Sequence, residues 1–320
     1  MFKSIDELVT TATNQGLPLS EVIINQEILT SGKSREQIFQ RMRNNLATMK
    51  AAVERGTSGQ GVHSATGLTG GQAVKVKEYR QTHRTLSGDA MMAAVEGAIA
   101  TNEVNAAMGV ICATPTAGSS GTLPGILFAL NDRLKLTEDQ MLRFLFTAGG
   151  MGMIIANKAS IAGASGGCQA EVGSASAMGA AAAVEIAGGT PVQSANALAI
   201  AMSNLLGLVC DPLAGLVEVP CVNRNATGAG NALIAADLVL AGCTSLVPAD
   251  EVIAAMDKIG RQMPVELRET GLDGGADEPP DPVALGDPLK LKLLFFQEGV
   301  RRLITERRAP FLRPIKRILI

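Results

Sequence analysis

Three cysteines stand where the predicted helices of this chain end or break, and thiols in such places can bind a metal. Cys168 follows the segment GASGG, Cys210 closes an apolar helix just before an Asp-Pro pair, and Cys221 follows a proline. Loop backbone has free N–H groups, which help to hold and tune the sulfur atoms of iron–sulfur centres. Three cysteine ligands and a vacant fourth position would leave one iron open.

The spacing of these cysteines does not by itself identify a site. The gaps of 41 and then 10 residues match neither zinc ribbons nor ferredoxin motifs. Five cysteines in 320 residues are too few for a secreted disulfide scaffold, so we expect free thiols, metal ligands or catalytic groups. Cys112 and Cys243 are predicted to be buried packing residues.

Two segments rich in glycine and hydroxyl residues offer the other chemistry. Residues 57–71 read TSGQGVHSATGLTGG, and CATPTAGSSGTLPG follows a predicted helix further along. Such backbone turns sharply and presents amides and hydroxyls to a small polar ligand, although a flexible linker has the same composition. His63 lies in the first segment, and an imidazole titrates near neutral pH, so it is a candidate base. The chain has two histidines and no His-x-x-x-His pair, which argues against a histidine-rich metal site.

Composition excludes several classes of function. The formal net charge is −2 and the pI about 5.8, so we expect neither nucleic acid nor an anionic membrane as a partner. The long uncharged runs are broken by glycine and proline before they reach the roughly 20 apolar residues of a membrane span. The N-terminus lacks the pattern of a secretory signal, which predicts a cytoplasmic protein.

The predicted fold class is mainly α, because apolar residues recur with helical period and no strand-like alternation persists. With 3% aromatic residues and 35 glycines, the interior must consist of small side chains on closely packed helices. Residues 1–271 are predicted to form a helical catalytic domain, with N-terminal amphipathic helices in 1–56 and the core in 57–271. The Pro-rich tail 272–320 is predicted to be poorly ordered. Helices are expected near 4–13, 20–30, 34–55, 87–108, 123–131, 137–160, 169–187, 193–209, 228–241 and 248–260.

Three segments of the chain together resemble the iron–sulfur-dependent L-serine dehydratases. They are GASGGCQAEVGSASAMGAAAAVEIAGGTPVQ, NLLGLVCDPLAGLVEVPCVNRNATGAGNA and EVNAAMGVICATPTAGSSGTLPG. The similarity covers about residues 1–270 and is greatest to the catalytic α chain of the two-subunit form. It implies deamination of L-serine to pyruvate and ammonia with a [4Fe-4S] cluster, a separate β subunit with a regulatory domain, and an oligomer.

Carried over position by position, the resemblance assigns roles to individual residues. Cys168, Cys210 and Cys221 would be the cluster ligands, and the two glycine-rich loops would line the substrate pocket. His63 is the candidate general base, and Lys75 and Arg224 are candidates to meet the substrate carboxylate. The candidate substrate contacts in the loops are Ser64, Thr66, Thr69, Gly70, Gly71, Thr116, Ser119 and Ser120.

Two other readings stay open at this stage. A pyridoxal-phosphate dehydratase would catalyse the same net reaction through a Schiff-base lysine, for which Lys75 and Lys158 are candidates. A non-catalytic helical scaffold would explain the small-residue helices and leave the cysteines inert. The agreement with the family pattern stops near Gly271, and no functional residue is predicted beyond it.

Overall fold

The computed structural model describes residues 2–210 and 216–270, and over these residues the chain is built from helices alone. The predicted mainly α class is confirmed. The tail 272–320 lies outside the described residues, so the domain division at residue 271 stays a prediction. The α-helices are α1 (Ile5–Gln15), α2 (Leu19–Ser31), α3 (Arg35–Gly56), α4 (Gln72–Thr82), α5 (Asp89–Ala106), α6 (Thr122–Leu134), α7 (Glu138–Lys158), α8 (Gly163–Gly166), α9 (Ser174–Ile186), α10 (Pro191–Ser203), α11 (Cys221–Leu240) and α12 (Ala249–Gln262).

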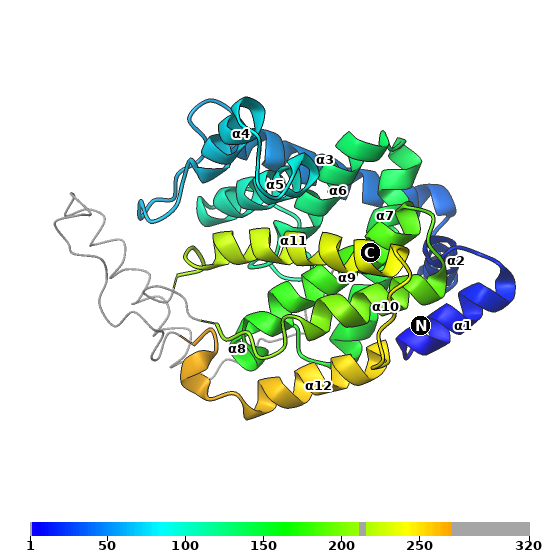
Figure 1. Cartoon of the computed structure of the whole chain (residues 1–320). Coiled ribbons are helices and arrows are strands. Elements are labelled where there is room, and N and C mark those ends of the chain that lie inside the picture. The colour runs from blue at the N-terminus through cyan, green and yellow to red at the C-terminus, as the bar shows by residue number, and fades with distance from the viewer. Residues whose placement is uncertain (1, 211–215, 271–320) are drawn as a thin grey trace.

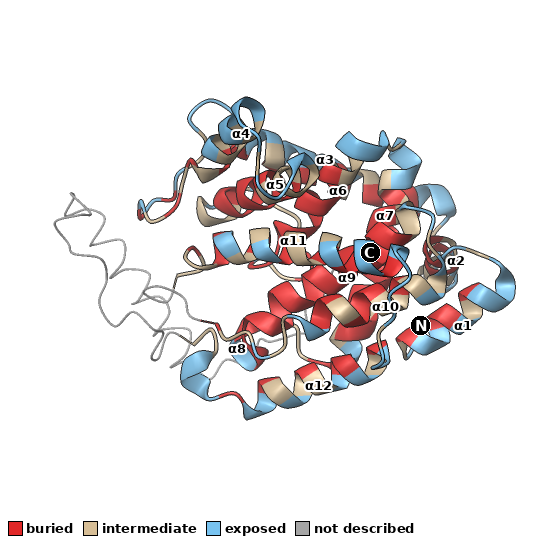
Figure 2. Cartoon of the chain, viewed as in Figure 1, coloured by how far each residue is buried: buried red, intermediate tan, exposed pale blue. Residues whose placement is uncertain are grey.

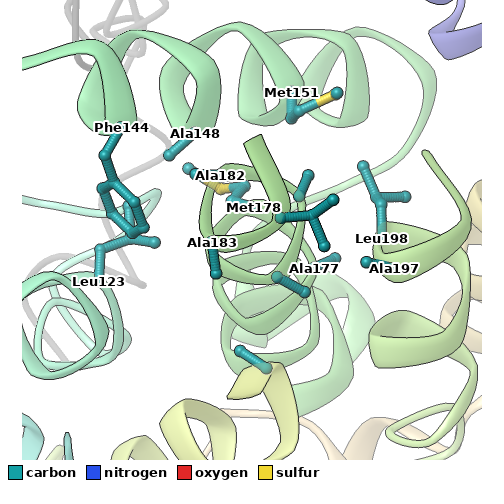
Figure 3. Close-up of a cluster of buried hydrophobic side chains, with 14 of the residues drawn as sticks. Leu123, Phe144, Ala148, Met151, Ala177, Met178, Ala182, Ala183, Ala197 and Leu198 are labelled. Atoms are coloured by element: carbon teal, nitrogen blue, oxygen red, sulfur yellow. The ribbon is translucent and has the colours of Figure 1, made fainter. Parts of the chain in front are cut away.

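Helix α9 forms the centre of the molecule, and its sequence explains why. Every residue from 174 to 184 is buried, so the helix has no solvent face, as expected of a core helix. Helices α6, α7, α10 and α11 pack around it, and Figure 2 shows it buried along its length. The close-up in Figure 3 places Met178, Ala182 and Ala183 of α9 among Leu123, Phe144, Ala148 and Leu198 from its neighbours.

Small residues let neighbouring helices approach closely. A Cβ on Gly97 of α5 would lie 3.0 Å from the Cα of Gly125 on α6, and a Cβ on Gly179 of α9 would lie 2.3 Å from Ile126 Cδ1. A larger side chain at either position would therefore require its neighbours to move. The glycine-rich composition is used to bring helix axes together.

Serine side chains cap α3 and α1, whose sequences both have Ser followed three residues later by Gln or Glu. Ser34 and Gln37 form a complete capping box. Ser4 accepts a hydrogen bond from the amide of Glu7, but the Glu7 carboxylate accepts from the Lys3 amide and not from that of Ser4. Both helices begin directly after the capping serine.

The elements differ most from the sequence prediction in four places. Helix α4 was not predicted, because its mean hydropathy is low and it buries only Ala73. Helix α11 begins at Cys221, seven residues before the predicted start, and α10 ends at Ser203, six residues before the predicted end. A π-helical turn, Gln169–Gly173, stands where a regular helix was expected.

The structural elements expected to carry chemistry lie at one side of the molecule. Figure 1 shows the loop before α4, the start of α11 and α8 all toward the left of the view. Across the described ranges, none of the helices combines the length and apolarity that a bilayer crossing requires.

The close helix crossing between α5 and α6 makes a first prediction. In Gly125→Ala the new Cβ would lie 2.4 Å from the carbonyl oxygen of Ala94, so we expect a loss of about 1–3 kcal/mol in the free energy of unfolding. Gly230→Ala is the matched control, since its Cβ would meet only Met91 Sδ at 3.1 Å. Urea denaturation measures both, and equal stabilities would contradict the close-packing argument.

Candidate functional site

The three cysteines named from the sequence are all buried, and none forms a disulfide. Each is 1% exposed. Cys168 directly precedes the π-helical turn, Cys210 follows the turn after α10, and Cys221 is the first residue of α11. Cys168 and Cys221 therefore stand at the borders of helical elements, as expected. The expectation that Cys210 closes a helix was wrong, because α10 ends at Ser203 and Cys210 lies in the irregular segment that follows.

Backbone and amide contacts hold the Cys168 and Cys210 segments together. The amide of Gln169 donates to the carbonyl of Leu208 at 3.0 Å, and the Gln169 side-chain oxygen accepts from the Gly207 amide at 2.9 Å. Cys168 and Cys210 also share one small apolar cluster with Val172, Leu205 and Leu208. The two thiols thus come from segments paired through a single glutamine.

The pKa values of the three thiols show that they influence one another. A hydrogen bond from Cys210, helped by the nearby charge of Arg224, lowers the pKa of Cys168 to about 7 against the opposing effect of burial. The same hydrogen bond raises the pKa of Cys210. Burial, and next the charge on Cys168, raises the pKa of Cys221. One thiol is therefore poised to be a thiolate near neutral pH.

The thiols do not by themselves form a site for one ion. Among the residues that the structure describes, no three His, Cys, Asp or Glu side chains are grouped so as to hold a metal ion. An iron–sulfur cluster makes a different demand, because each of its cysteines binds a separate iron. Three buried thiols with mutual electrostatic influence are a chemically suitable donor set for such a cluster.

The first glycine-rich loop is organised around a buried carboxylate, that of Glu218. The hydroxyl of Thr66 lies 2.9 Å from both carboxylate oxygens, and that of Thr69 lies 3.1 Å from one of them. Ser64 Oγ lies 3.0 Å from the Thr66 hydroxyl and 3.2 Å from the Thr69 carbonyl. All three predicted hydroxyl residues are buried, and they converge on an acid that is three residues before Cys221.

The second glycine-rich loop is held by Asn225 of α11. Its side-chain oxygen accepts from the amides of Gly121 and Thr122, both at 3.0 Å, and its nitrogen donates to the Gly118 carbonyl at 2.7 Å. Within the loop, Thr116 and Ser119 hydroxyls lie 3.0 Å apart.

The predicted contact Ser120 is fully buried in the same loop. Among the described residues, its hydroxyl has no hydrogen-bond partner. A hydroxyl in that condition retains its capacity to bind a ligand.

The candidate base His63 lies against the two glycines that precede α4. A Cβ on Gly70 would lie 2.5 Å from His63 Cδ2, and one on Gly71 would lie 3.3 Å from its Nε2. Both glycines have positive φ, so only glycine gives the ring this room without strain. His63 is exposed and pairs with Gly70 in an isolated β-bridge.

A buried acid, Glu103, supports the same corner of the site. Its carboxylate accepts from the amides of Gln72 at 2.7 Å and Ala73 at 3.3 Å, at the start of α4. Burial raises the pKa of Glu103, while these amides and the charges of His63 and Lys75 lower it. Lys75 itself is exposed on α4.

A pair of acids, Glu171 and Glu269, lies beside the thiols. A Cβ on Gly163 would lie 2.4 Å from Glu269 Oε2 and 3.1 Å from Glu171 Oε2, so both carboxylates press against one glycine. Burial, and next the charge of Glu269, raises the pKa of Glu171 to about 8, and Thr116 of the second loop hydrogen-bonds to it. At neutral pH the pair therefore retains a proton.

The remaining predicted residues lie in different surroundings. Arg224 donates to the Val209 carbonyl at 2.7 Å and lies near Cys168, so it faces the thiols. Cys112 is half-buried against the main core, and burial raises its pKa to about 11. Cys243 is exposed, so its prediction as a buried residue was wrong: it follows α11, where the chain turns at the surface. Lys158 pairs with Asp250 at 2.9 Å.

The fold and the site together define a helical protein with three buried thiols from distant segments. The second glycine-rich loop is hydrogen-bonded to α11, the helix that begins with the third thiol, Cys221. Residues 14–276 match the model of a known family, the serine dehydratase alpha chain. The chain belongs to this family.

Individual members of this family are similar in sequence to the chain over most of its length. The chain is 60% identical over 279 residues to the probable L-serine dehydratase, alpha chain, of Bacillus subtilis, covering 87% of this chain and 92% of the relative. It is 42% identical to the L-serine dehydratase, alpha chain, of Peptoniphilus asaccharolyticus, over 86% and 94% of the two chains. It is 37% identical to the L-serine dehydratase of Streptomyces coelicolor, covering 85% of this chain and 60% of that protein.

Sequence reasoning missed the acids and the amide that organise the site. Glu171 is the only charged residue between Lys158 and Glu185, and an isolated charge in so apolar a stretch was a usable signal. Glu218 is likewise the only charged residue in the segment GLVEVPC. Asn225 carried no comparable signal, because its role depends on a loop about a hundred residues away.

The acid pair makes a prediction for the metal-free protein. The folded pKa of Glu171, about 8, lies above its usual 4.5, so the folded state binds more protons than the unfolded state between these values. Stability attributable to this group is therefore present below pH 4.5 and is lost as pH rises toward 8. We expect Glu171→Gln to flatten this slope and to gain on the order of 2 kcal/mol at pH 8.

Thermal unfolding from pH 5 to 8.5 tests this expectation. Glu185→Gln removes a half-buried acid on the far end of α9 that is bound to the Ser20 amide and whose pKa burial also raises, so it measures how much of the slope another carboxyl contributes. A Glu171→Gln profile parallel to that of the unmodified protein would show that the pair does not retain its proton.

Proposed function

We propose that this chain is the catalytic α chain of an L-serine dehydratase, which converts L-serine to pyruvate and ammonia. The observation that carries the proposal is a set of three buried, electrostatically linked thiols in a member of the serine dehydratase alpha chain family. The relatives' names state the same substrate.

The reaction sets two requirements for the site. The α-proton of serine is weakly acidic and hydroxide is a poor leaving group, so both positions need assistance. Loss of the α-proton and of the 3-hydroxyl as water gives aminoacrylate, which becomes the imine; addition of water to the imine releases ammonia and leaves pyruvate.

Cys168, Cys210 and Cys221 would hold a [4Fe-4S] cluster. When bound, the cluster would supply a Lewis-acidic iron for the carboxylate and the 3-hydroxyl of the substrate. Ligand cysteines must be deprotonated, and the lowered pKa of Cys168 favours the first such step. Arg224 would stabilise the negative charge of these thiolates. Its position beside Cys168 supports this role.

The two loops would bind and orient the amino acid. Ser64, Thr66 and Thr69 belong to one hydrogen-bonded network. The hydroxyl of Ser120, which has no partner among the described residues, can hydrogen-bond to a ligand. Gly70 and Gly71 leave room for the substrate and for the ring of His63.

His63 would accept the α-proton. Its ring is accessible on a polar loop, and the carboxylate of Glu103 lies close enough for their charges to interact. That interaction would stabilise the imidazolium formed when the proton arrives. Lys75, near the same carboxylate, would attract the carboxylate of the approaching substrate.

A separate β subunit and an oligomeric enzyme complete the proposal, together with a cytoplasmic location. The two-subunit form is supported by the names of the alpha-chain relatives and by the Streptomyces protein, of which the alignment covers 60%. We propose that a second chain provides what the rest of that protein's length supplies.

The cysteine assignment predicts a clear pattern in single variants. Cys168→Ala, Cys210→Ala and Cys221→Ala should each lose the broad visible absorbance of an iron–sulfur cluster after anaerobic purification. Cys112→Ala should retain it, because that thiol packs against the main core. Iron and sulfide analysis per chain measures the pattern, and full iron in a Cys221→Ala protein would remove that residue from the ligand set.

The base assignment predicts a contrast between the two histidines. His63→Ala should reduce kcat for L-serine by about 10²–10⁴-fold, the usual contribution of a general base, and keep the cluster absorbance. His83→Ala should keep both, since that ring stacks on Tyr79 at the end of α4. Pyruvate formation is measured by coupled assay, and near-normal turnover of His63→Ala would refute the assignment.

A further inference from the structure

A single carboxylate joins the first glycine-rich loop to the segment that carries Cys221. Glu218 is 6% exposed, and its side chain accepts the hydroxyls of Thr66 and Thr69. Its backbone carbonyl accepts the amide of Val222 at 3.0 Å, in the first turn of α11. The main chain of Glu218 is thus hydrogen-bonded to the start of α11, while its side chain is hydrogen-bonded to the first glycine-rich loop.

We infer that Glu218 is a positioning residue, which sets the place of the hydroxyl loop relative to Cys221. The inference rests on the proposed function for its catalytic meaning, since the loop is proposed to bind the amino acid and Cys221 to hold the cluster. In the sequence the two are about 150 residues apart, so the side-chain contact is what relates them.

The geometry indicates that the acceptor atoms of Glu218 matter to the loop. Thr66 Oγ1 lies 2.9 Å from each carboxylate oxygen and also accepts the amide of Leu68 at 3.1 Å. Thr69 lies 3.1 Å from one carboxylate oxygen and shares two contacts with Ser64. The hydroxyls of Ser64, Thr66 and Thr69 thus form one hydrogen-bond network, in which the Glu218 carboxylate is the final acceptor.

A buried hydroxyl left without its acceptor is costly, so loss of the Glu218 side chain should release the loop. Glutamine has nearly the same shape as glutamate and retains one oxygen, that of its amide, as a hydrogen-bond acceptor. We therefore expect Glu218→Gln to preserve the position of the loop and Glu218→Ala to lose it. A role based on the negative charge alone would instead impair both variants equally, since both lack the charge.

Hydrogen exchange of the metal-free full-length protein tests the contact without any turnover. In Glu218→Ala, amides of residues 64–73 should exchange about tenfold faster, a change of the size expected when a charge-assisted hydrogen bond is lost. In Glu218→Gln they should stay within about threefold of the unmodified protein. Glu185→Ala, which removes a carboxylate bonded to the Ser20 amide, should leave these amides unchanged.

Kinetics of the anaerobically reconstituted protein give the second readout. Glu218→Ala should bind as much iron as the unmodified protein and should show a KM for L-serine raised about tenfold or more. In the Thr66→Val, Thr69→Val background, Glu218→Ala should add little, because its partners are already absent.

Three results would overturn the inference: unchanged exchange in Glu218→Ala, equal impairment of Glu218→Gln, or additive effects in the threonine background. Failure of the unmodified protein to convert L-serine would instead refute the proposed function. The exchange measurements would still decide whether Glu218 positions the loop.

Discussion

The carboxamide of Asn225 is the interaction on which the arrangement of the site most depends. Within the first two turns of α11 it donates to the Cys221 carbonyl at 2.9 Å and to the Gly118 carbonyl at 2.7 Å, while its oxygen accepts from Gly121. It is fully buried, and without its oxygen the buried amide of Gly121 would lose its acceptor. The Gly118 carbonyl would keep only its contact with Asn102. With Glu218 just before the helix, the start of α11 holds both glycine-rich loops and one of the three thiols. The site is therefore organised from a single helix end.

The acids and thiols of the site have pKa values that are shifted in different directions. Burial raises the pKa of Glu103, and the amides at the start of α4, a favourable place for an anion, oppose that rise. Glu171 lies beside another acid, and burial and repulsion raise its pKa to about 8. Cys168 shows the opposite behaviour, since the hydrogen bond from Cys210 lowers its pKa to about 7. A proton is thus held on the carboxyl pair in the pH range in which the neighbouring thiol gives one up.

The sequence predicts the fold class and the candidate thiols of the site better than it predicts how the site is organised. Helical periodicity and capping residues locate most helices, because both are local properties. The three cysteines are recognisable because element ends are also local. Helix α4 was missed since it is polar and little buried, and the true start of α11 was missed because Pro220 and Cys221 read as a loop until the helix is seen to begin there. Asn225 and Glu218 act across more than a hundred residues, and no local pattern encodes such a pairing.

The small-residue core explains how three distant thiols can keep a constant relation. Cys168 stands before the π-helical turn that leads directly into α9, and Cys221 begins α11, so the packing of α9 against α11 determines how these two sulfur atoms lie. That packing is polar as well as close. Ser176 Oγ donates to the Gly228 carbonyl at 2.8 Å and accepts from Asn231 at 2.9 Å, both on α11. Buried hydrogen bonds resist sliding because a shift would leave their partners unsatisfied. Glycine and alanine bring the two helices together, and Ser176 sets their register, so the composition of the core bears directly on the geometry of the thiols.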